Sequence, residues 1–193
     1  MTERRHSFLG RLLAAAFALV GLTASNVLAT GETSAKSPYL GEEYRAIKSL
    51  SAEDVEDLLS GRGWGQAKPA ELNGYPGPRH VLDLANKLSL SSAQQAAIER
   101  IFEAMQAQAM RIGHDYVATE RALDDGFRSK QIDRSRLVKL TEEAAQLRAK
   151  LRQIHLQAHL ETAPLLNRHQ HLKYAKLRGY RGAHEPRHQR GGD

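Results

Sequence analysis

The chain has 193 residues, a formal net charge of +6 and no cysteine. Without cysteine, disulfide frameworks, thiolate-bound zinc, thioether-linked haem and thiol nucleophiles are all excluded. Aromatic residues make up 6% of the chain, which disfavours a β-sheet core because strands favour aromatic and β-branched side chains. No proline falls between residues 79 and 163, a stretch rich in strong helix formers. These features together predict an all-α protein.

Residues 1–29 have the three parts of a secretory signal peptide. Arginines at the start are followed by an uncharged apolar run of 11 residues, and Val27 and Ala29 fit cleavage after Ala29. A membrane-spanning helix needs about 20 apolar residues. We therefore expect a periplasmic protein with no stable membrane span after cleavage. The alternative is that this segment is kept as an uncleaved anchor.

The rest of the chain divides into three parts. Residues 30–78 predict a flexible arm, with one short helix that begins at the capping residue Ser51 and a Gly/Pro loop over residues 61–78. Residues 79–180 predict a helical hairpin domain. Residues 181–193 are rich in Arg and His and lack large apolar side chains, which predicts a disordered tail.

Two long segments of the hairpin domain carry apolar residues at alternating steps of three and four, the spacing of a coiled coil. Gly126 and the polar residues that follow it predict a turn between Asp125 and Asp133. The two segments then pair as a long antiparallel helical hairpin, with short helices at its open end from His80 to Leu88 and from Arg168 to Arg178. The seam residues are Ile98, Phe102, Met105, Ala109, Ile112, Tyr116, Thr119 and Leu123, then Leu137, Leu140, Ala144, Leu147, Leu151, Ile154 and Ala158.

Two helix starts share one pattern, a Leu followed by a polar capping residue and, three residues after the cap, a Gln. In such a capping box the cap side chain accepts from the backbone N–H three residues on, while the Gln side chain accepts from the N–H of the cap. The preceding Leu can act as a hydrophobic staple. The six motif residues are Leu90, Ser91 and Gln94, and Leu166, Asn167 and Gln170.

A chain with a signal peptide, a cysteine-free helical hairpin and two such motifs resembles the LTxxQ-motif family of periplasmic proteins. This family includes chaperones of the Spy and CpxP type and heavy-metal resistance and sensor proteins of the ZraP and CnrX type. Ser91 and Asn167 stand where the family has Thr, and both cap a helix as well as Thr does. The resemblance implies a curved antiparallel homodimer whose basic concave face holds partly unfolded protein clients, or an envelope signalling partner, without ATP.

The second long helix carries an excess of cations between residues 130 and 152. This stretch contains seven Lys and Arg residues but only three carboxylates, so it could attract acidic client segments. The plainer interpretation is a solvated helix face. The seven cations are Lys130, Arg134, Arg136, Lys139, Arg148, Lys150 and Arg152.

His155 and His159 form the main candidate for a metal site. Histidines four residues apart lie on one helix face, a spacing that can chelate Zn²⁺, Ni²⁺ or Cu²⁺. The pair is expected beside the seam, with Met105 and Glu161 as further ligands. The alternative function is therefore a periplasmic heavy-metal-binding sensor or resistance protein, and the competing interpretation is a polar flank without an ion.

No catalytic motif is evident in the sequence. A phosphate-binding loop after a strand and a G-x-S-x-G nucleophile elbow are both missing, so we expect a non-enzyme that requires no cofactor. Nucleic acid is not an expected partner, because the basic residues lack interleaved aromatic side chains. Val138, Leu156 and Leu160 fall outside the intramolecular seam, and we expect the short helices and a second copy of the chain to cover them in a homodimer.

Overall fold

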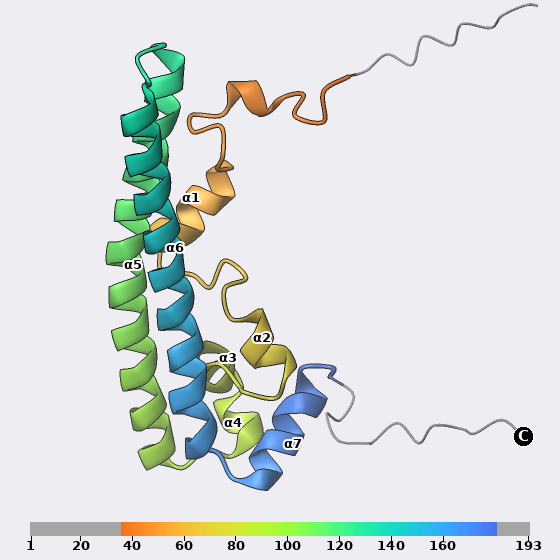
Figure 1. Cartoon of the computed structure of the whole chain (residues 1–193). Helices are drawn as coiled ribbons and strands as arrows, with labels where there is room; N and C mark the ends of the chain where they lie inside the picture. Colours follow the sequence, from red (N-terminus) through yellow and green to blue (C-terminus); the bar gives the residue numbers. More distant parts are fainter. Residues whose placement is uncertain (1–35, 181–193) are drawn as a thin grey trace, which may run out of the picture. The chain divides into compact units, whose positions relative to one another are not determined.

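The computed structural model describes residues 36–180. The predicted signal peptide and the predicted tail from residue 181 lie outside these residues. Residues 38–180 belong to one compact unit. Its helices are α1 (Ala52–Leu59), α2 (Lys68–Leu72), α3 (Pro78–Asp83), α4 (Ala85–Leu88), α5 (Ser92–Arg128), α6 (Arg134–Thr162) and α7 (Arg168–Leu177), with short 3₁₀ turns at Glu42–Tyr44 and Ala163–Leu165. Residues 36–180 contain no β-strand, and the all-α prediction is confirmed (Figure 1).

The two long helices α5 and α6 form the predicted antiparallel hairpin (Figure 1). The turn falls between Arg128 and Arg134, as expected. Asp133 caps α6 by accepting a hydrogen bond from the backbone N–H of Arg136 at 2.7 Å. Gly126, predicted as part of the turn, lies in the last turns of α5 instead, where the side chain of Ile132 packs close to it: a Cβ there would lie 2.9 Å from the Cδ1 atom of Ile132.

The predicted seam, with its alternating steps of three and four residues, is the inner face of the hairpin. Its members are buried or half-buried on both helices, from Ile98 to Leu123 on α5 and from Leu137 to Ala158 on α6. Burial of this stripe removes apolar side chains from water, which is the main favourable contribution to folding. None of the helices in residues 36–180 combines the length and the hydropathy that crossing a bilayer would take.

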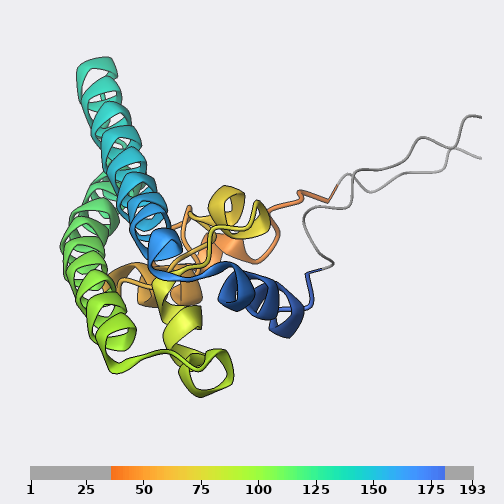
Figure 2. The ribbon, with the colours of Figure 1, turned by 90° about the horizontal axis from the view of Figure 1, so that it is seen from below.

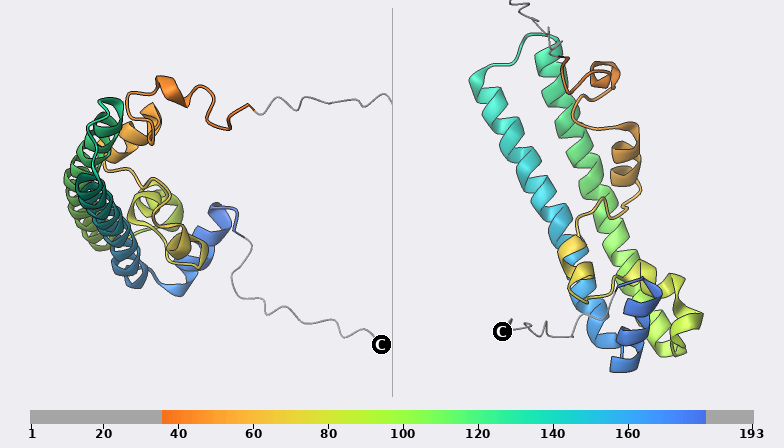
Figure 3. Two further views of the ribbon diagram at one scale, coloured as in Figure 1. Left: turned by 45° about the horizontal axis from the view of Figure 1, so that its top comes forward. Right: turned by 90° about the vertical axis from the view of Figure 1, so that its right-hand side faces the viewer.

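The short helices all lie on one side of the hairpin (Figures 2 and 3). Pro78 occupies the first turn of α3, where a missing N–H costs nothing. The helix predicted from His80 to Leu88 is two helices, because Leu84 leaves helical geometry at φ −105° and ψ 10°. This break redirects the chain so that α4 reaches α7.

The segment predicted as a flexible arm is instead packed against the hairpin. Ile47 and Leu50 are 2% and 3% exposed. They join Leu58 of α1 in one apolar cluster with side chains of α5 and α6. We call residues 45–66 the strap. The prediction failed because two apolar residues three apart, in a stretch without periodicity, are enough to anchor a segment once a hairpin face is available to receive them.

The apolar residues outside the seam are less covered than expected. Leu156 is half-buried, but Leu160 is 59% exposed and Val138 is 46% exposed. The short helices therefore do not cover Leu160 as the sequence suggested. The face of α6 that they do cover carries His155, His159 and Thr162.

Candidate functional site

Both motif helix starts are capping boxes, as predicted. In the first, Ser91 Oγ accepts from the N–H of Gln94 at 3.2 Å, and Gln94 Oε1 accepts from the N–H of Ser91 at 3.0 Å. In the second, Asn167 Oδ1 and Gln170 Oε1 make the same two contacts, each at 2.9 Å. Each box satisfies N–H groups that a helix start otherwise leaves without a partner.

The two boxes are joined to each other through their glutamines, which the sequence did not reveal. Gln94 Nε2 donates to Gln170 Oε1 at 2.9 Å, and Gln170 Nε2 donates back to Gln94 Oε1 at 3.1 Å. The same two amide groups donate to the carbonyls of Leu165 and Leu88, at 2.7 and 3.4 Å. We call these four side chains, Ser91, Gln94, Asn167 and Gln170, the motif network. It locks the starts of α5 and α7 together.

The leucines of the motifs complete this arrangement. Leu166 is buried at 6% exposure, and Leu90 packs against the same apolar cluster. That cluster also holds Val81 of α3 and Tyr174 of α7. All six predicted motif residues therefore meet at the open end of the hairpin.

A half-buried carboxylate, Glu71 of α2, holds α7 in place beside this network. Glu71 Oε1 accepts from Tyr174 Oη at 2.7 Å, Tyr180 Oη at 3.1 Å and Arg178 Nε at 3.2 Å. Burial and the hydrogen bond to Glu71 raise the pKa of Tyr174, so its hydroxyl stays a donor at neutral pH. This centre could not be predicted from the sequence, because Glu71 lies in a Gly/Pro-rich stretch without a motif.

The predicted histidine pair lies next to Glu71 and is buried. His155 is 3% exposed and His159 is 8% exposed. His159 Nδ1 lies 2.7 Å from the carbonyl oxygen of Tyr75 and 3.9 Å from Glu71 Oε2. Gly77 makes this approach feasible, because a Cβ there would lie 2.7 Å from the imidazole of His159. The pair therefore lies in the interior and not on an exposed flank of α6.

Burial sets the charge of His155. It lowers the pKa of His155 to about 4, and the nearby His159 contributes to the shift. The ring of His155 is consequently neutral at pH 7, the form in which imidazole binds metal ions. Within residues 36–180 no hydrogen bond to the ring of His155 is found, although it lies in the interior.

The further ligands predicted for a metal do not gather around the pair. Glu161 is exposed and accepts a hydrogen bond from Gln157 Nε2 at 2.8 Å. Met105 is buried in the seam at 9% exposure. In the part of the chain that the structure describes, no three His, Asp or Glu side chains are grouped so that they could hold an ion. The structure thus brings together two of the four predicted ligands.

The seven cations predicted for the client-facing surface are all exposed. Among the described residues none of them has an ion pair, and only Arg148 has a side-chain partner. Its guanidinium lies 5.4 Å from the centre of the Trp64 ring, a cation–π distance. The surface is therefore available to an acidic partner along most of α6.

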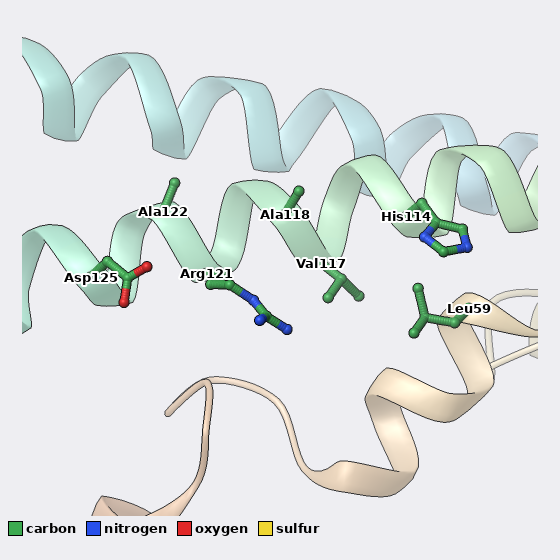
Figure 4. A pocket seen from close by; sticks show the side chains of 7 residues that line it. All are labelled: Leu59, His114, Val117, Ala118, Arg121, Ala122 and Asp125. Carbon is green, nitrogen blue, oxygen red and sulfur yellow. The ribbon is translucent and has the colours of Figure 1, made fainter.

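Trp64 links the strap to both long helices. Its ring lies 5.8 Å from that of Tyr116 on α5, and its Nε1 donates to Asp54 Oδ1 at 2.7 Å. Beside this contact the strap leaves a hollow of about 340 Å³ against α5. Figure 4 shows Leu59 of the strap facing Val117 across this space, with Arg121 reaching from α5 toward the strap.

No protein-family model, curated protein or solved structure matches the chain. Functional inference therefore depends on the side chains described above. These are the motif network at the starts of α5 and α7, the histidine pair of α6, and the unpaired cations of the turn and α6. The resemblance to the LTxxQ-motif family stays a prediction.

Proposed function

We propose that the protein is an exported, ATP-independent chaperone-like or envelope-stress protein of the LTxxQ type, which binds partly unfolded clients on its surface. The observation that carries the proposal is the set of seven exposed cations in the turn and on α6, none of which has an ion pair among the described residues. Such an excess of positive charge attracts acidic segments at a distance.

The motif network supports the same proposal. Two capping motifs far apart in sequence serve one joint at the open end of the hairpin, where they fix the geometry of the frame. Surface binding needs no nucleotide site, and the sequence shows no phosphate-binding motif. We infer a frame that holds clients rather than one that performs chemistry on them.

The test is suppression of aggregation of an unfolding client by the chain lacking residues 1–29, without ATP. We expect protection at a few-fold molar excess, and we expect it to weaken when Arg134, Arg136 and Lys139 are replaced by Gln. Replacing the exposed and unpaired Arg111 of α5 by Gln is a matched control. If aggregation proceeds unchanged at a several-fold excess, the proposal fails.

A homodimer forms part of this proposal. Val138 and Leu160 lie outside the seam and are exposed in the single chain. Fully burying a Leu side chain contributes about 1.5–3 kcal/mol, so a second copy that covers both positions would gain stability from them. Light scattering at tens of micromolar should give twice the mass of one chain. A mass equal to that of one chain would contradict the dimer. It would also remove the concave client-binding face that two copies are proposed to form.

The alternative function is a periplasmic heavy-metal-binding sensor or resistance protein. The observation that favours it is the buried His155, which burial keeps neutral, with His159 one helical turn away. Calorimetric titration with Zn²⁺, Ni²⁺ and Cu²⁺ tests this proposal. A site of micromolar or better affinity, lost in the His155→Ala/His159→Ala variant, would support it. If affinity disappears only when residues 181–193 are deleted, the buried pair is not the site.

A further inference from the structure

The hollow of about 340 Å³ between the strap and α5 has the form of a small ligand site (Figure 4). Pockets that bind small ligands begin at about this size. Six of its lining side chains come from α5 at alternating steps of three and one, so they share one face of the helix. They are His114, Val117, Ala118, Arg121, Ala122 and Asp125, and Leu59 at the end of α1 faces them.

The floor of the hollow is apolar and continuous with the core. Val117 is 5% exposed and belongs to the apolar cluster that the strap shares with the hairpin. Leu59 packs against the same cluster. Ala118 and Ala122 each contribute a single methyl group to the lining, which leaves the space above the floor open. An apolar ligand would therefore lie on a surface that the fold already holds in place.

Arg121 places an unpaired positive charge in the hollow. Its side chain reaches from α5 toward the strap (Figure 4), and within residues 36–180 its guanidinium makes no hydrogen bond, ion pair or ring contact. Asp125 also lines the hollow, but its carboxylate pairs with Arg128 at 2.7 Å. Four arginines in the strap or in contact with it do have a carboxylate or aromatic partner, namely Arg45, Arg62, Arg128 and Arg148. Arg121 is therefore available to bind an anion.

An unpaired guanidinium beside an apolar floor fits a carboxylate that carries an apolar body. Arginine presents its N–H groups as a planar fork that matches the two oxygens of a carboxylate. Val117 lies between Arg121 at one end of the hollow and Leu59 and His114 at the other (Figure 4). From Arg121 to His114 the helix rises about 10 Å. This length suits an unbranched acyl chain of medium length.

A peptide fits the hollow less well than a free acid does. The α5 lining belongs to one continuous helix, whose backbone N–H and C=O groups are bonded within the helix. A peptide laid along it would gain no backbone hydrogen bonds from α5, although its own amides need partners when they leave water. An acyl chain has no such groups. The observations therefore favour a fatty acid over the end of a protein chain.

We propose that the hollow binds a medium-chain fatty acid, with its carboxylate on the guanidinium of Arg121 and its chain on Val117 and Leu59. The seven cations assigned to client binding do not line the hollow, so this site goes beyond the proposed function and is independent of it. The bound acid would contact both α5 and α1. Because it binds the folded chain, it should also raise the midpoint of thermal unfolding.

Calorimetric titration with octanoate tests the anchor. Arg121→Gln should weaken binding about tenfold, because it removes a charged hydrogen-bond donor. Arg111→Gln is the matched control, since it removes an exposed and unpaired arginine of the same helix outside the hollow, and it should leave the affinity unchanged. Octanol, which has the same chain without the charge, should bind about tenfold more weakly than octanoate. Equal affinity of Arg121→Gln and Arg111→Gln for octanoate would overturn the proposal.

Filling the hollow tests the place of the acyl chain. Ala118→Phe puts a large side chain into the space and should abolish octanoate binding. Ala107→Phe, at an exposed position of α5 outside the hollow, should bind octanoate as the unsubstituted chain does. Urea denaturation of both variants shows that each is folded. If Ala118→Phe binds octanoate as tightly as Ala107→Phe does, the hollow is not the site.

Amide NMR signals of the unsubstituted chain locate the ligand directly. Octanoate should shift the signals of residues 114–125 and of Leu59. Shifts confined to α6 would mean that the acid only adsorbs to the basic surface, and the proposal would be wrong. A short peptide with a C-terminal leucine that binds more tightly than octanoate would overturn the assignment to a fatty acid. Client holding that fails while octanoate binds as expected would refute the proposed function and leave this inference standing.

Discussion

The open end of the hairpin and the strap region are both covered by short helices, but by different means. At the open end, α7 is fixed by buried or half-buried side chains with several partners each, chiefly Gln170 and Glu71. In the strap region, the polar contacts Ser49–Glu120 and Lys48–Asp124 are exposed, and apolar side chains provide most of the attachment.

The two regions differ in the free energy that each loses when a polar contact opens. A buried amide or carboxylate that loses its partners pays the full cost of desolvation, so the open end resists partial opening. An exposed hydrogen bond is replaced by one to water at little cost. The same hairpin thus carries a joint held mainly by polar side chains and a cover held mainly by apolar ones, and the predictions below test that contrast.

Removal of the carboxylate at the centre of the open end should have the largest effect. Glu71→Ala leaves two tyrosine hydroxyls and Arg178 without their acceptor, and we expect the free energy of unfolding to fall by about 3 kcal/mol. Urea denaturation measures it. The control is Glu103→Ala, an exposed carboxylate on α5. A loss below that of Glu103→Ala plus experimental error would mean that α7 does not depend on Glu71.

The motif network should rank second. Gln170→Ala removes a buried amide that is 5% exposed, and we expect a loss of about 2 kcal/mol. Asn167→Ala removes only an exposed cap and should cost about 1 kcal/mol. The double variant Gln94→Ala/Gln170→Ala should cost less than the sum of the single changes, because the two amides share partners. Strict additivity would contradict the joint.

Acid should weaken the protein through His155. Its pKa is lowered to about 4 in the folded chain, while an unfolded histidine takes a proton below a pH of about 6.5. The unfolded state therefore binds more protons between these values, and stability falls as the pH drops through this window by about 1.4 kcal/mol per unit. His155→Gln should flatten this slope in urea denaturation at several pH values. His114→Gln, at an exposed position, should leave it unchanged.

The smallest effect is expected at the strap. Lys48→Ala removes an exposed ion pair with Asp124 at 3.8 Å, worth less than about 1 kcal/mol. The loss should vanish in 1 M salt, where such pairs are screened. At low salt, the loss of stability should be seen in the hydrogen exchange of α1 rather than in urea denaturation of the whole chain. Lys150→Ala, at an unpaired cation of α6, is the control, and an equal effect of the two changes would refute the prediction.

The parts of the fold that were predictable depend on local regularities. Alternating three- and four-residue steps identify the seam, and the capping residues Ser51, Ser91 and Asn167 mark helix starts by hydrogen bonds that span three residues. Together with these steps, the absence of proline between residues 79 and 163 predicted two uninterrupted long helices. Each of these signals is contained in one stretch of sequence.

What the sequence did not reveal depends on which segment covers which face. The histidine pair is buried because the backbone at Tyr75 and Gly77 lies against it, and no periodicity in α6 indicates that choice. Leu160 has a more apolar side chain than either histidine, yet it remains exposed. The only hint was Gly77 itself, since a glycine before Pro78 permits the close approach of another side chain.

The order in which the chain emerges has a consequence for how these two regions form. The partners in the motif network are 76 residues apart, and those at Ser49 and Glu120 are 71 apart, whereas α5 and α6 are joined by a short turn. Contacts between distant residues close slowly because the loop between them must first be ordered. The hairpin can therefore fold early and offer a template. The strap, made first, has to wait for a surface that is synthesised later, and the joint at Gln170 is the last to close.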